Sequence, residues 1–147
     1  MSGVLAVLAR FAVVLIGYGA ACLAASAFSH VLFLGWSGLA EEEAYPIFAT
    51  GAMISVPLLA LFMAHFNFWP SVAAIIIAEF TGKRDWLFYA LAGGFVALAF
   101  AGLFYRGAEG AAETHDMALL LAMVGSGVVG GLAYWLVAGM WTPDWRK

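Results

Sequence analysis

The chain has 147 residues, of which 65% are hydrophobic and only 10% are charged, with a formal net charge of −3. A soluble domain carries about a quarter charged residues, so this composition excludes a protein whose surface faces mainly water. Without a basic tract, the weak negative charge also excludes a nucleic-acid-binding protein. The single cysteine, Cys22, excludes an internal disulfide and a cysteine-bound iron–sulfur cluster.

The first predicted membrane span covers residues 11–36 and directly follows Arg10. Its apolar run exceeds the roughly 20 residues that a helix needs to cross a bilayer. Small residues around Cys22 and Ala25 resemble signal-cleavage patterns, but the apolar run continues past them. We therefore expect an uncleaved membrane helix.

The second predicted span, residues 47–65, is followed by a shorter apolar stretch at residues 70–81. As a helix, this stretch would reach about 15–18 Å, roughly half of the hydrocarbon core. Pro70 suits the first turn of a new helix, because its missing N–H has no helical partner there. The sequence therefore predicts a short interfacial or re-entrant helix.

Two further spans are predicted at residues 86–105 and 117–141. With both termini inside, one side of the membrane holds five of the six basic residues, as the positive-inside rule requires, namely Arg10, Lys83, Arg84, Arg146 and Lys147. The outer loops hold mainly acids: Glu41, Glu42, Glu43, Glu109, Glu113 and Asp116, with Arg106 as their one base. We predict an all-α membrane protein, a single polytopic domain over residues 1–147 with four transmembrane helices, one short helix and both termini inside.

Three segments carry a resemblance to other sequences: Ala78-Glu79-Phe80, Trp86-Leu87-Phe88-Tyr89-Ala90-Leu91-Ala92-Gly93-Gly94, and Gly-Leu-Ala-Tyr-Trp-Leu-Val-Ala-Gly at residues 131–139. With these segments, the chain resembles small uncharacterised bacterial inner-membrane proteins. The resemblance implies a multi-pass protein of the bacterial inner membrane. It implies no activity, cofactor or site.

Small residues recur at helical spacing in the last two spans. Gly127 and Gly131 form a GxxxG pair, Gly130 lies on an adjoining stripe, and Gly94 belongs to the preceding span. Small residues let helices approach closely in lipid. The pattern predicts helix packing inside one bundle, and the alternative is a homo-oligomer seam on the last span.

A polar stripe lies on the first span, where Tyr18, Cys22, Ser26 and His30 recur every four residues. Polar groups on a membrane helix normally face protein or water. The stripe predicts hydrogen bonds between helices, and the alternative is that it lines a polar pathway.

The predicted inner interface holds His65, Asn67 and Glu79 near the short helix. Glu79 follows an apolar run, where a carboxylate is costly unless it is paired. We expect it to pair with Lys83 or Arg84, with Lys83 in the favourable i+4 position. The alternative is an ion or proton site.

The sequence predicts no metal and no cofactor. His30 and the loop residues Glu113, His115 and Asp116 have no recognised ligand spacing. No nucleophile–base arrangement, phosphate loop or paired-carboxylate motif is visible, so the sequence gives no indication of an enzyme.

We therefore expect a non-enzymatic membrane protein, either an accessory subunit or an oligomeric scaffold. Its partners would be the lipid bilayer and other membrane subunits or further copies of itself. The alternative is a small oligomeric channel or transporter for an ion or small solute, lined by residues of the sets above.

Overall fold

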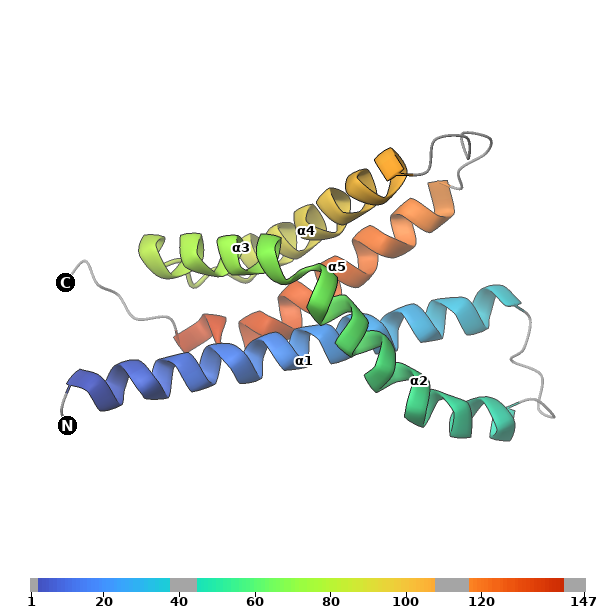
Figure 1. Cartoon of the computed structure of the whole chain (residues 1–147), viewed down its shortest axis with the longest axis horizontal. Helices are drawn as coiled ribbons and strands as arrows, with labels where there is room; N and C mark the ends of the chain where they lie inside the picture. Colours follow the sequence, from blue (N-terminus) through green and yellow to red (C-terminus); the bar gives the residue numbers. More distant parts are fainter. Residues whose placement is uncertain (1–2, 38–44, 108–116, 142–147) are drawn as a thin grey trace.

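The computed structural model describes residues 3–37, 45–107 and 117–141, and these are almost wholly helical (Figure 1). The elements in chain order are α1 (Gly3–Ser37), α2 (Tyr45–Phe66), α3 (Phe68–Thr81), α4 (Trp86–Gly107), α5 (Met117–Val137) and the short 3-10 helix η1 (Gly139–Trp141). The prediction of an all-α membrane protein with a short extra helix is confirmed. The acidic loop residues, His115, Arg146 and Lys147 lie outside the described residues.

Within the described residues, α1, α4 and α5 are each long and apolar enough to cross a membrane. The 22 residues of α4 reach about 33 Å, close to the thickness of a hydrocarbon core. A fourth candidate span is the bent pair formed by α2 and α3. Counting this pair as one span gives four spans, although the prediction counted residues 47–65 as a span alone and the short helix separately.

The bend between α2 and α3 measures 72° and has a local cause. The N–H of Asn67 still donates to the carbonyl of Met63 at 2.9 Å, so helical hydrogen bonding reaches the junction. Pro70 then has no N–H to donate to the carbonyl of Phe66, four residues earlier. A proline that interrupts the hydrogen-bond ladder in this way is a common cause of a sharp kink.

The far end of α3 is closed by Gly82, which adopts the left-handed conformation with φ 60°. The N–H of Lys83 donates to the carbonyl of Ala78 at 3.2 Å, which satisfies a carbonyl at the helix end. This tight ending lets the chain reverse over four residues and start α4, against which α3 packs.

The helices share two ends, which Figure 1 shows at its left and right. The basal end contains the start of α1, the end of α3, the start of α4 and the end of α5. The distal end contains the end of α1, the start of α2, the end of α4 and the start of α5. This alternation is the arrangement that four successive crossings produce.

The closest helix packing joins α4 to α5 along their glycines. A side chain added at Gly127 would collide with the backbone of Gly93, and one added at Gly131 would collide with the carbonyl of Tyr89. Only glycine allows two backbones to approach this closely. Gly94 lies beside this seam, where an added carbon would lie 3.3 Å from Val128.

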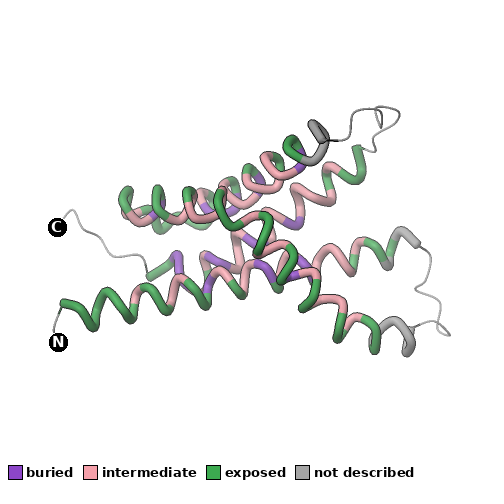
Figure 2. Tube along the Cα trace, viewed as in Figure 1, coloured by how far each residue is buried: buried purple, intermediate pink, exposed green. Residues whose placement is uncertain are grey.

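The opposite side of α5 packs on α1. A carbon added at Gly130 would lie 3.1 Å from the carbonyl oxygen of Ala21 and 3.3 Å from the side chain of Ala25. Many of the buried residues lie where α5 packs on α1 and on α4, whereas most of the described part of α2 is exposed (Figure 2). The three well-packed helices therefore form the core, and α2 leans on α1 at its edge.

Candidate functional site

The polar stripe of α1 faces α2 through two of its hydroxyl groups. Tyr18 donates its hydroxyl hydrogen to the carbonyl of Ala64, and Ser26 donates to the carbonyl of Val56, each at 2.7 Å. Ser26 is completely buried. Both bonds join side chains of α1 to backbone oxygens of α2, so they fix the position of the more exposed helix.

His30 extends the same contact toward the distal end. Its Nδ1 lies 3.0 Å from the carbonyl oxygen of Ser26, and its Nε2 lies 2.8 Å from the hydroxyl of Ser55 on α2. A carbonyl only accepts, so Nδ1 carries the hydrogen of its bond to Ser26. His30 therefore connects the two helices through both of its nitrogens.

Glu79 has a different partner from the expected Lys83 or Arg84: it forms an ion pair with Arg10 at the start of α1. The Nε of Arg10 lies 3.1 and 3.3 Å from the two carboxylate oxygens, and Nη2 makes a further short contact. The two side chains are 16% and 23% exposed, so the pair is largely shielded.

Arg10 also closes the end of α5. Its Nη1 donates to the carbonyls of Ala138 at 3.1 Å and of Trp141 at 3.3 Å. Carbonyls at a helix C-terminus lack helical partners and carry partial negative charge, which a cation satisfies. The guanidinium therefore joins α1, α3 and the end of α5. We call this group of residues the basal clamp: Arg10, Glu79, Ala138 and Trp141.

The remaining predicted site residues lie apart from the clamp. His65 is exposed and its ring lies edge-on to Phe66, with ring centres 5.4 Å apart. Asn67 is at the break between α2 and α3, where its side chain does not cap α3. The structure thus brings together Tyr18, Ser26 and His30 along α2, and it places Glu79 at a separate site with Arg10.

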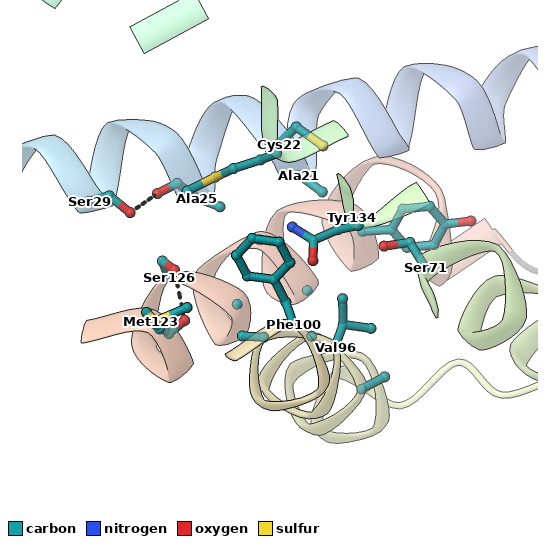
Figure 3. A pocket seen from close by; sticks show the side chains of 18 of the residues that line it. Ala21, Cys22, Ala25, Ser29, Ser71, Val96, Phe100, Met123, Ser126 and Tyr134 are labelled. Atoms are coloured by element: carbon teal, nitrogen blue, oxygen red, sulfur yellow. Dashed lines mark hydrogen bonds between the residues drawn. The ribbon is translucent and has the colours of Figure 1, made fainter. Parts of the chain in front are cut away.

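A cleft of about 380 Å³ lies between the helices, and its walls are almost wholly apolar. It runs from Tyr18 to Phe33 along α1 and from Tyr134 to Leu119 along α5. Figure 3 shows Phe100 of α4 pointing toward α1 across this space. Asn67 and Tyr18 line it, whereas His30, His65 and Glu79 are not among its described lining residues.

Neither the cleft nor the basal clamp could be predicted from the sequence. Arg10 and Glu79 are 69 positions apart, and the nearby Lys83 offered a local alternative. Ser71, Tyr89 and Tyr134 also line the cleft but lie on different helices with no shared motif. The packing of α4 against α5 and of α3 against α4 brings them together.

Comparison with known proteins gave no match to a protein-family model, to a curated protein or to a solved structure.

Proposed function

We propose that this helical membrane protein has a non-enzymatic role in assembly, as an accessory subunit of a larger membrane complex or as a homo-oligomeric scaffold. The proposal rests on one observation: the polar side chains of α1 form hydrogen bonds to α2. The side chains of Tyr18, Ser26 and His30 bond to α2, so they act in holding helices together. The bilayer is the environment in which these bonds form.

The same geometry favours assembly over conduction. A channel or transporter needs ionisable groups that face a water-filled path. Here both nitrogens of His30 are engaged, and the carboxylate of Glu79 is held by Arg10. The described walls of the cleft carry no charged side chain, which suits apolar contents better than ions.

The outer surface offers room for partners on α2. Met53, Leu58 and Leu61 are 81%, 65% and 69% exposed, and α2 packs mainly on α1. Helices associate in lipid through close van der Waals packing, and this exposed face leaves room for such a contact. The proposal therefore assigns α2 as the face that meets a second copy or another subunit.

Native mass measurement after extraction in lipid nanodiscs tests this role. The expected result is a mass above that of one chain, from a second copy or from a co-purified subunit. A single chain without any partner, extracted from the membrane in which it is made, would overturn the proposal.

Cysteine cross-linking in the Cys22→Ala background then tests the face. Leu61→Cys, on the exposed side of α2, is expected to cross-link to a second protein chain. The neighbouring Ala60→Cys is the matched control, because Ala60 is only 5% exposed and faces the bundle. Equal cross-linking at both positions, or none at Leu61→Cys, would contradict the assignment of α2.

A further inference from the structure

One line of side chains on α1 faces α2 in the distal part of the helix and continues into the basal part. Tyr18 and Ser26 each donate to a carbonyl of α2, and Ser26 is completely buried. Leu8 lies 18 residues before Ser26, and Val4 lies 18 residues before Cys22. Eighteen residues make about five full turns, so the members of each pair point the same way from α1, which Figure 1 shows as a nearly straight helix.

The basal part of this line is uncovered. We call it the α1 stripe, and its four large apolar side chains are 68%, 58%, 61% and 53% exposed, namely Val4, Leu8, Phe11 and Leu15. The bond from Tyr18 to Ala64 lies close to the end of α2 at Phe66. The chain then bends by 72° into α3, which packs against α4. The cover that α2 gives to this line of α1 therefore ends near Tyr18.

The start of α1 also extends past the ends of its neighbours. Arg10 bonds to Glu79 near the end of α3 and to the carbonyl of Trp141 in η1, so these ends lie level with Arg10. The helix begins at Gly3, seven residues or about 10 Å earlier. Residues 3–9 are all exposed. Two apolar turns therefore project beyond the basal clamp.

The length of α1 exceeds what lipid chains can cover. Its apolar span of 31 residues is about 46 Å long, whereas the hydrocarbon core is about 30 Å thick. A tilt of about 40°, at the upper end of the usual range, still leaves about 5 Å outside the core. By contrast, the 21 residues of α5 reach about 32 Å and match the core. The surplus of α1 lies at the basal end, where Val4 and Leu8 need a protein surface to shield them from water.

The spacing of the α1 stripe selects a second copy of the chain as that surface. Positions 4, 8, 11 and 15 are separated by steps of four and three, which is the heptad spacing of paired helices. A two-fold axis along the membrane normal brings the same stripe of a second copy to the same depth. Arg10 is the only charged residue among residues 3–16, and its side chain is held by Glu79, so no like charges oppose the pairing.

We propose that the α1 stripe packs against the α1 stripe of a second copy in a parallel dimer. The inference rests on the proposed assembly role and deepens it, because it names one partner and the segment that meets it. The exposed face of α2 stays available for a further contact.

Disulfide cross-linking of the full-length chain in its native membrane tests the pairing, in the Cys22→Ala background. Leu15→Cys is expected to form a dimer on mild oxidation. Ile16→Cys is the matched control, because Ile16 is 65% exposed at nearly the same depth but points about 100° away from Leu15. Since a disulfide needs Cα atoms within about 7 Å, we expect at least about fivefold more dimer at Leu15→Cys. Co-expression of chains with two different tags should give a product that carries both.

A charge in the stripe should separate the two copies. Leu8→Lys places two ammonium groups opposite each other, and like charges across a contact strongly disfavour it. We expect about tenfold less dimer from Leu15→Cys in this background. Leu5→Lys, at a position that is 55% exposed but off the stripe, is the control and should leave the yield unchanged. Thermal unfolding of each variant reports whether the fold is retained.

Several results would overturn this pairing. These are no dimer at Leu15→Cys, equal yields at Leu15→Cys and Ile16→Cys, an equal loss in Leu8→Lys and Leu5→Lys, or a product with a different protein. If Leu8→Lys does not fold, the first comparison decides alone. Cross-linking of Leu61→Cys to another subunit, without a dimer through α1, would remove this inference and leave the proposed assembly role in place.

Discussion

At the scale of single residues, the described polar groups in the spans mainly hold helices in place. Arg10 does this most completely, because one guanidinium bonds to the carboxylate of Glu79 and to two carbonyls near the end of α5. A planar group with five donors can serve three acceptors at once, which an ammonium group cannot do with the same geometry.

Removing Arg10 should therefore cost more stability than neutralising Glu79. Exposed ion pairs contribute about 0–1 kcal/mol, whereas breaking a buried pair costs about 3–5 kcal/mol. For this largely shielded pair we expect Arg10→Ala to lower the free energy of unfolding by about 2 kcal/mol and Glu79→Gln by about 1 kcal/mol. Unfolding by dodecyl sulfate in mixed micelles measures both. Lys83→Ala, at an exposed position, is the control, and an equal loss in all three variants would refute the clamp.

Two serines on α1 offer a matched comparison. Ser26 bonds across to α2, whereas Ser29 bonds to its own helix. Hydrogen bonds between membrane helices average about 0.6 kcal/mol, and loss of one leaves the carbonyl of Val56 unpaired. We expect Ser26→Ala to destabilise the protein by about 1 kcal/mol and Ser29→Ala by less than about 0.5 kcal/mol. The reverse order in the same unfolding assay would show that α1 and α2 are not joined as described.

At the scale of helices, the positions of the elements could largely be predicted from the sequence. The apolar runs predicted where the helices lie, because a membrane span must satisfy its own backbone and is therefore a continuous helix. Pro70 and the shortness of the apolar stretch at residues 70–81 predicted a separate short helix, and α3 begins and ends close to those residues. The direction of the 72° bend and the partner of Glu79 depend on how distant helices pack, and no local pattern encodes that.

The glycine seam between α4 and α5 should be the least tolerant helix contact. In Gly127→Ala, the new carbon would lie 2.7 Å from the side chain of Ala97 and would also meet the backbone of Gly93. Overpacking of this kind costs about 1–3 kcal/mol, and we expect the upper part of that range because backbone cannot move aside.

Gly19→Ala provides the control for this seam. Gly19 lies on α1 with open space where a side chain would be added. Alanine is favoured over glycine in a helix by up to about 1 kcal/mol, so this variant should be unchanged or more stable. Thermal unfolding in detergent compares the two, and equal melting temperatures would contradict the seam.

At the scale of the whole molecule, the helices form a closely packed core of α1, α4 and α5, with a bent α2–α3 arm at its edge. The basal clamp and the α1–α2 hydrogen bonds attach this arm to the core. The cleft lies where the arm leaves the core, and its walls come from all five long helices. The face of α2 proposed for assembly is its exposed one, with Leu58 and Leu61, whereas Leu59 and Met63 of the same helix line the cleft.

The central claim is that the chain crosses the membrane four times and that its basal end lies on the inner side. Reporter fusions after Trp36, Lys83, Gly110 and Lys147 test it most directly. The fusions after Lys83 and Lys147 are expected to report the inside, and those after Trp36 and Gly110 the outside, because the basic residues concentrate on one side. An external signal at Lys83 or Lys147 would contradict the four crossings.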